Sequence, residues 1–249
     1  MSDNNAQKSE HWHRRLLEGK GALFAVLTTV AISIGGIAEI IPLITADPDV
    51  EARERIQPYT ALELAGRDIY VREGCYVCHS QMVRPFRSET LRYGRTWSHS
   101  EEYVWDRPFQ LGSRRAGPDL HGVGKKYPDS WHYDHMRDPR SKTDGSVMPP
   151  YPWLLTWKID TADIQATMTA HKIAGTPYTD EQIAQAGESM QEQGTAIADR
   201  IKTDLKLADD KVKWDDEIVA LTAYLQSLGR NKPDEVVLES GDGSAEVSQ

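Results

Sequence analysis

The pattern of apolar and polar positions divides the chain into one long apolar segment near the N-terminus and a larger region of shorter, amphipathic segments. Residues 21–44 contain no charged side chain except Glu39. At ~1.5 Å per residue, a helix over this segment is roughly 36 Å long, enough to cross a bilayer core of about 30 Å. The pattern therefore predicts a single transmembrane helix over residues 21–45, preceded by an N-terminal segment 1–20.

The charges that flank the apolar segment predict its orientation. Basic residues precede it and acidic residues follow it: Lys8, Arg14, Arg15 and Lys20, then Asp47, Asp49 and Glu51. The positive-inside rule places segment 1–20 in the cytoplasm and the rest of the chain outside. A cleaved signal peptide is the alternative, but the apolar run exceeds the ~7 to 15 residues of its usual core. Cleavage after Ala46 would also require a small residue two positions earlier, where this chain has the bulky Ile44. We therefore expect an uncleaved anchor.

Beyond a linker at 46–59, several segments have helical periodicity. A helix is expected from Thr60 to Glu73, ending at Gly74. Residues 82–118 show no sustained periodicity and are expected to form an ordered loop region. Residues 137–153 contain four prolines and cannot be helical through their centre.

The C-terminal part of the chain begins with a capping box formed by Thr179 and Gln182. Apolar residues at helical spacing continue from there to Leu207, within an acidic helical insertion at about 179–214. Asp215 or Asp216 should open a last helix, with Gly229 at its C-terminal stop. The polar tail 232–249 is expected to be disordered. The predicted fold is mostly α-helical, with its main domain at 60–231.

Charge and cysteine content narrow the function. The net charge is −9, and residues 1–45 carry four basic and four acidic groups, so the acidic excess lies in residues 46–249. An acidic surface argues against nucleic acid as a partner. Only two cysteines occur, so the sequence contains neither a disulfide framework nor a four-thiolate metal site.

The segment Cys75-Tyr76-Val77-Cys78-His79 carries the strongest chemical signal. Its spacing lets two thiols add to the vinyl groups of one haem c while the adjacent imidazole binds the iron. A thioredoxin-like pair would follow a strand, a zinc site would need further ligands, and a plain disulfide leaves His79 unexplained. We therefore predict that Cys75 and Cys78 hold a haem covalently and that His79 is an iron ligand.

The sixth iron ligand must come from elsewhere in the chain. Met148 is the best candidate of the six methionines, because Pro149 and Pro150 brace its loop. His121 and His135 are weaker alternatives. A His/Met-ligated iron has a raised potential and no open site, which suits electron transfer.

A second motif supports the haem assignment. Gly117-Pro118-Asp119-Leu120-His121-Gly122 resembles the GPxLHG segment of the cytochrome c superfamily. That resemblance implies that the Pro118 carbonyl accepts a hydrogen bond from His79 and fixes its tautomer. It also implies that an N-terminal helix crosses a C-terminal one, through residues such as Gly66 and Tyr70 on the first and Leu221, Tyr224 and Leu225 on the last.

Longer stretches of the sequence point to one protein family more specifically than the haem motif does. The segments SIGGIAEIIPLI, HSQMVRPFR, WDRPFQLGSRRAGPDLHGVG, SVMPPYPWL and IVALTAYLQSLG resemble the mono-haem subunit II of cbb3-type cytochrome c oxidases over most of residues 21–230. Glu39, Ala116 and the acidic insertion depart from that pattern.

The resemblance implies a heteromeric complex in a bacterial cytoplasmic membrane, with the haem domain in the periplasm. This subunit would pass electrons from a di-haem cytochrome c subunit to a haem-copper catalytic subunit that reduces oxygen and pumps protons. The resemblance also implies a calcium ion at the subunit interface, approached by Ser113. A freestanding anchored cytochrome is the alternative; the small residues Ala31, Gly35 and Gly36 and the costly Glu39 favour partner helices over lipid around the anchor.

Overall fold

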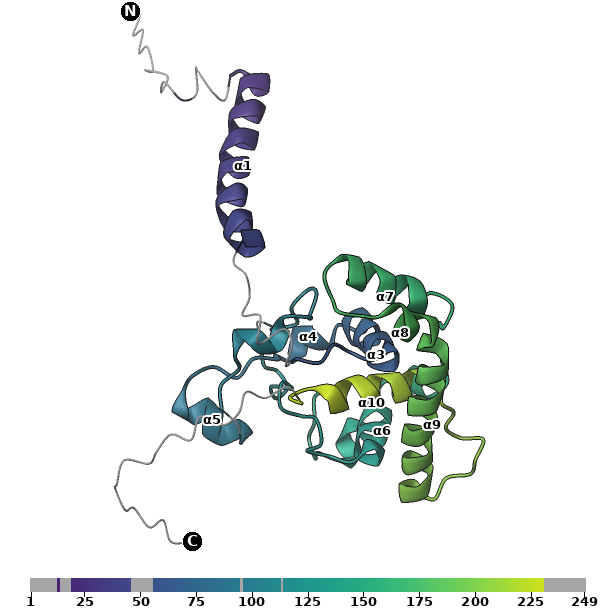
Figure 1. Ribbon diagram of the computed structural model, residues 1–249. Helices are drawn as coiled ribbons and strands as arrows, with labels where there is room; N and C mark the ends of the chain where they lie inside the picture. Colours follow the sequence, from purple (N-terminus) through teal and green to yellow (C-terminus); the bar gives the residue numbers. More distant parts are fainter. Residues whose placement is uncertain (1–12, 14–18, 46–55, 95, 113, 231–249) are drawn as a thin grey trace, which may run out of the picture. The chain divides into compact units, whose positions relative to one another are not determined.

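The chain forms two compact units, residues 1–50 and residues 51–249. The computed structural model describes residues 13, 19–45, 56–94, 96–112 and 114–230 (Figure 1). Most of segment 1–20, positions 46–55 of the predicted linker and the whole predicted tail 232–249 therefore lie outside the described residues.

The first unit contains helix α1, Gly21–Thr45. Among the described residues it is the one helix long and apolar enough to cross a membrane, over Gly21–Ile41. Large apolar side chains along it are exposed, including those of Phe24, Ile32 and Ile34. Because a helix that is apolar on all sides is stable only in an apolar environment, α1 has the character of a membrane anchor.

The second unit is built from helices and loops, and its described residues contain no strand, only an isolated bridge between Lys158 and Asp216. The predicted mostly α-helical fold is thus confirmed. Its α-helices are α3 (Ala61–Arg72), α4 (Cys75–Cys78), α5 (Arg87–Tyr93), α6 (Asp129–Arg137), α7 (Ile164–Ile173), α8 (Asp180–Ala184), α9 (Ala186–Leu205) and α10 (Glu217–Ser227). Within the described residues, the 3₁₀ turns η2 (Ser100–Tyr103), η3 (Pro139–Ser141) and η4 (Pro152–Leu155) accompany them.

Helices α3 and α10 cross at the centre of this unit, as the resemblance to cytochromes c implied (Figure 1). Thr60 caps α3 through a reciprocal capping box with Glu63. A Cβ added to Gly66 would lie 1.9 Å from the carbonyl oxygen of Ala220, so the two backbones touch there. The rings of Tyr70 and Tyr224 pack beside this contact with their centroids 5.3 Å apart. The crossing therefore depends on the small residue at position 66.

Helix α9, within the predicted acidic insertion, packs into the same core. Met190, Ile197 and Ile201 on its inner face are at most 3% exposed, and α9 contacts α3, α6 and α10. Outside the core, Arg200 pairs with Asp129 of α6 at 2.6 Å. The acidic residues form the outer face of a helix that is an integral part of the unit.

Several boundaries differ from the sequence-based expectation. The region 82–118 was expected to be loop, but it contains α5 and η2. Helices α6 and α7 were not predicted at all. The helical segment after Thr179 is interrupted at Gln185, which separates α8 from α9. The last helix begins after Asp216, and Gly229 has a left-handed φ of 81° just beyond its end, as expected for a helix stop.

Candidate haem site

The cysteine motif forms one helical turn directly after α3. Gly74 has a φ of 70°, which lets the chain turn from α3 into α4 without strain. The amide of His79 donates to the carbonyl of Cys75 at 2.9 Å, and the backbone of His79 is extended. Both cysteines are free, with Cys75 half-buried and Cys78 exposed. Two thiols one turn apart are thus presented beside the imidazole.

The thiol chemistry does not favour a cysteine-based redox site. Burial, followed by the nearby charge of Glu73, raises the pKa of Cys75 to about 12. Reactive and metal-binding cysteines need the opposite shift, because the thiolate is the active form. Within the described ranges no group of three or more His, Cys, Asp or Glu side chains is arranged to hold a metal ion. The zinc alternative therefore finds no further ligands there.

The ring of His79 is held on one side by segment 117–118. Its Nδ1 lies 2.8 Å from the carbonyl oxygen of Pro118. A carbonyl can only accept, so Nδ1 carries the proton and donates, which leaves the lone pair of Nε2 free for a metal. Burial lowers the pKa of His79 below its ordinary value, which keeps the ring neutral at pH 7.

Gly117 completes this support. A Cβ at position 117 would lie 2.2 Å from Cε1 of His79, so only glycine allows the ring to lie so close to the backbone. The amide of Gly117 donates to the carbonyl of Cys78 at 3.0 Å, and the amide of Leu120 donates to the carbonyl of Ser80 at 2.8 Å. The GPDLHG segment therefore runs along the residues that flank His79, and its Gly117 and Pro118 hold the imidazole in place.

Met148 lies in a loop that is tied down at two points. The amide of Tyr151 donates to the carbonyl of Met136 at the end of α6 at 2.8 Å. Trp153 Nε1 donates to Glu73 at 3.1 Å, two residues before the first cysteine. The half-buried side chains of Met148 and Cys75 pack against one hydrophobic core. These ties bring the methionine loop to the cysteine motif, although the two are far apart in sequence.

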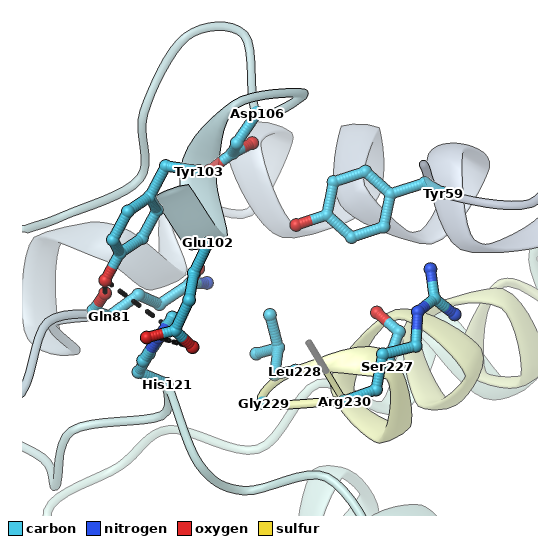
Figure 2. A pocket seen from close by; sticks show the side chains of 10 residues that line it. All are labelled: Tyr59, Gln81, Glu102, Tyr103, Asp106, His121, Ser227, Leu228, Gly229 and Arg230. Carbon is cyan, nitrogen blue, oxygen red and sulfur yellow. Dashed lines mark hydrogen bonds and ion pairs between the residues drawn. The ribbon is translucent and has the colours of Figure 1, made fainter. Parts of the chain in front are cut away.

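The alternative ligand His121 is engaged elsewhere. Its Nε2 pairs with Glu102 at 2.8 Å, its Nδ1 lies 3.4 Å from the hydroxyl of Tyr103, and the ring stacks on Tyr103. Figure 2 shows these residues around a polar cavity of about 30 Å³ that Gln81 and Asp106 also line. None of Cys75, Cys78, His79 and Met148 lines this cavity. Both nitrogens of His121 have partners, so His121 is not presented as an iron ligand.

A charged network that sequence reasoning missed fixes the chain directly after His79. Arg115 donates from Nε to the hydroxyl of Ser80 at 2.6 Å and from Nη2 to the carbonyl of Met82 at 2.6 Å. Asp119 accepts from Ser80 Oγ at 2.7 Å and from the amide of Met82 at 2.8 Å. Arg115 also pairs with Glu89 of α5 at 2.8 Å.

The one indication of this network in the sequence is the set of stretches in which its residues lie. All its members except Glu89 lie in the stretches HSQMVRPFR and SRRAGPDL, which carry much of the specific family resemblance. Position 113, where the calcium contact of Ser113 was expected, lies outside the described residues. Its neighbour Gly112 has a φ of 69°, and the carbonyl of Leu111 accepts from the amide of Gln81 at 2.9 Å.

The family comparison matches this geometry. A family model described as cytochrome C oxidase, mono-heme subunit/FixO covers residues 13–232. The chain belongs to this family. A search among curated proteins found no match. The chain is therefore a mono-haem subunit of a cytochrome c oxidase, and the family implies a haem cofactor, oxidase partners and association with a membrane.

The described residues of this mono-haem subunit fit a haem. Two thiols one helical turn apart, and an imidazole that Gly117 approaches closely and that has a bare Nε2, are the groups that would hold a haem. Half-buried Met148 provides a thioether on a loop tied to the cysteine motif.

Proposed function

We propose that this subunit carries one covalent haem c, attached at Cys75 and Cys78, with His79 and Met148 as its axial ligands. The observation that carries the proposal is the 2.8 Å contact between Nδ1 of His79 and the Pro118 carbonyl, because it leaves Nε2 as a bare nitrogen ligand. A haem with these ligands changes between the ferric and ferrous states by one electron.

The residues of the chain make the site suited to electron transfer. Pro118 and Gly117 hold His79 in one orientation, and Trp153 and Tyr151 hold the methionine loop. With both axial positions supplied by the protein, no coordination site remains for oxygen or another substrate. Little rearrangement accompanies the electron, since the ligands are fixed before it arrives.

In the complex, this subunit relays electrons in a cbb3-type oxidase, from a di-haem cytochrome c subunit to the haem-copper catalytic subunit, where oxygen is reduced to water and protons are pumped. Helix α1 anchors it as a single span in a bacterial cytoplasmic membrane. The basic flank before α1 supports a cytoplasmic N-terminus and a periplasmic haem unit. A calcium ion near Ser113 at the subunit interface belongs to the same proposal.

A freestanding anchored cytochrome that moves between complexes is the second candidate. Helix α1 favours the subunit instead, because the small residues Ala31, Gly35 and Gly36 suit close packing against a partner helix. Co-purification in mild detergent separates the two candidates. Stoichiometric recovery of a haem-copper subunit and a di-haem subunit is expected, and recovery of the chain alone would favour the freestanding carrier.

Haem attachment is tested on a denaturing gel stained for haem. The wild-type chain should stain, whereas the double variant Cys75→Ala/Cys78→Ala should not, because no thioether remains. Tyr76→Phe, between the two cysteines, is the matched control and should stain as the wild type does. A haem-staining band in the double variant would refute covalent attachment at these residues.

A further inference from the structure

The polar cavity shown in Figure 2 does not belong to the proposed haem site. It has a volume of about 30 Å³ and lies where several segments of the second unit meet. Tyr59, which precedes α3, lines it together with Gln81, Asp106 and residues 227–230 at the end of α10. Three of these side chains carry polar groups whose hydrogen bonding within the protein is incomplete.

Asp106 is a buried carboxylate whose two oxygens are held unequally. Its side chain is 4% exposed, and Oδ1 accepts from Nε of Arg67 at 2.7 Å. Oδ2 accepts from the amide of Gln110 at 3.4 Å, longer than the usual N–H···O distance of about 2.7–3.2 Å. A buried ion pair needs further hydrogen bonds to satisfy its remaining lone pairs. Oδ2 of Asp106 therefore requires a closer donor than the protein provides.

Tyr59 brings a hydroxyl group into the same cavity. Figure 2 shows the ring reaching inward, with the hydroxyl directed toward the centre. No residue in the described part of the chain bonds to this hydroxyl, although the Tyr59 carbonyl accepts from the hydroxyl of Tyr178 at 2.6 Å. Burial, followed by the charge of Asp106, raises the pKa of Tyr59, so the phenol keeps its proton at pH 7. The hydroxyl can thus both donate and accept.

Gln81 adds a donor from the chain that follows the proposed iron ligand. Its side chain is buried, and its amide group contacts the hydroxyl of Tyr224, with Nε2 donating at 3.0 Å and Oε1 accepting at 3.2 Å. Nε2 carries two hydrogens, and the bond to Tyr224 uses one of them. The other has no acceptor among the described residues.

The size and the charges of the cavity indicate what it binds. One water molecule needs about 10–15 Å³, so a volume of about 30 Å³ holds about two. A buried water typically makes about three hydrogen bonds to polar groups that otherwise lack partners. A metal cation is disfavoured, because Arg67 already neutralises Asp106 and the side chain of Arg230 also lines the cavity. A small neutral molecule that donates and accepts therefore fits best.

We propose that the cavity is a binding site for one or two ordered water molecules that bridge Tyr59, Gln81 and Asp106. The water accepts from Nε2 of Gln81, donates to Oδ2 of Asp106 and exchanges a hydrogen bond with the hydroxyl of Tyr59. Each of the three groups then has the partner that protein atoms do not supply. The inference does not depend on the haem, since none of these groups belongs to the haem site.

The bridging water joins segments that are far apart in sequence. Asp106 is fixed to α3 through Arg67, and Tyr59 directly precedes the cap of α3. Gln81 follows His79 by two residues. Water that bridges two protein groups is nearly as favourable in enthalpy as a direct hydrogen bond. The site therefore hydrates a buried ion pair and links the chain after His79 to the start of α3.

A structure of the wild-type chain tests the inference directly. It is determined in the purified oxidase, with the haem present, at a resolution that shows ordered waters. We expect water density within hydrogen-bond distance of the Tyr59 hydroxyl, Nε2 of Gln81 and Oδ2 of Asp106. A cavity without density, while other buried waters are visible, would overturn the inference. So would an ion at metal–oxygen distances of about 2.0–2.6 Å.

Two variants of the full chain test the role of the Tyr59 hydroxyl. Tyr59→Phe keeps the ring and removes the hydroxyl. Tyr178→Phe, the matched control, removes a buried hydroxyl that bonds directly to the protein. Oxygen-17 magnetic relaxation dispersion of the immobilised proteins counts their long-lived internal waters. The count should fall by one or two in Tyr59→Phe and stay at the wild-type value in Tyr178→Phe. An unchanged count in Tyr59→Phe, or an equal fall in both variants, would contradict the proposed bridge.

Discussion

Gly66 of α3 and Ala220 of α10 touch through their backbones, because a Cβ at position 66 would lie 1.9 Å from the Ala220 carbonyl oxygen and 2.9 Å from Cβ of Tyr224. Neither atom belongs to a flexible side-chain end that could move away. The close approach lets Tyr70 and Tyr224 pack against each other beside the contact. One absent methyl group therefore sets the distance between the two central helices.

Gly66→Ala should lower the free energy of unfolding by about 3 kcal/mol, because the helices must separate to admit the methyl group. Gly187→Ala is the matched control, since Gly187 lies in α9 with no atom within 4 Å of an added Cβ. That change should raise the free energy of unfolding by about 0.5–1 kcal/mol. Denaturant titration of both variants in detergent is the measurement, and equal effects would contradict the tight crossing.

The parts of this architecture that the sequence predicted are the local ones. The predicted capping pair Thr179–Gln182 lies three residues apart, so the chain itself brings it together. The cysteine motif and its histidine are contiguous. Helix α6 escaped prediction because polar residues occupy its buried face, with Asp129, His132 and Asp134 among them. Helix α5 is seven residues long and largely exposed, so it has no apolar periodicity to detect.

The long-range parts of the site had no local signal. Arg115 joins Ser80, Met82 and Glu89, and the partners are 26 to 35 residues away from it. The contact between His79 and Pro118 spans 39 residues and was expected only through the resemblance to cytochromes c. Distant pairing of this kind depends on the fold, which residue spacing alone does not specify.

Gly117→Ala should displace the imidazole of His79, because the new Cβ would lie 2.2 Å from Cε1. We expect a weakened iron–histidine bond, a partial change from low-spin to high-spin absorption and a loss of stability of about 1–3 kcal/mol. The haem should stay attached on a denaturing gel, since both cysteines remain. Ala116→Ser, at the exposed neighbouring position, should leave the spectrum unchanged. A wild-type spectrum in Gly117→Ala would show that the ring is not held in this way.

Met148→Leu should remove the sulfur-to-iron absorption band and lower the midpoint potential, because a thioether ligand favours ferrous iron. The decrease should be roughly 0.1 V or more, part of the ~0.8 V over which axial ligands set haem potentials. Met168→Leu is the control, since Met168 is 3% exposed in α7 and fills the core. If the band and the potential survive in Met148→Leu, Met148 is not the ligand and Met136 is the next residue to replace.

Glu89 is the acidic member of the network that fixes the chain after His79. Its side chain is 9% exposed, and Arg115 lies 2.8 Å away. The hydrogen bond from Arg115, with further bonds from Arg84, lowers the pKa of Glu89 to about 2. A carboxyl whose pKa is lower in the folded state stabilises the fold above its unfolded pKa of about 4.3. That contribution is lost as the pH falls toward 2.

Glu89→Gln should therefore destabilise the haem unit at pH 7 by about 1–2 kcal/mol, a value moderated because solvent reaches Arg84 and part of Arg115. The difference between the wild type and the variant should shrink between pH 5 and pH 2 and vanish only below pH 2, where both carry a neutral group at position 89. Glu192→Gln, at an exposed position of α9, is the control and should change stability little at either pH. Denaturant titrations at several pH values measure the difference. A difference that stays constant from pH 7 to pH 2 would mean that the charge of Glu89 does not hold Arg115, and hence the chain after His79, in place.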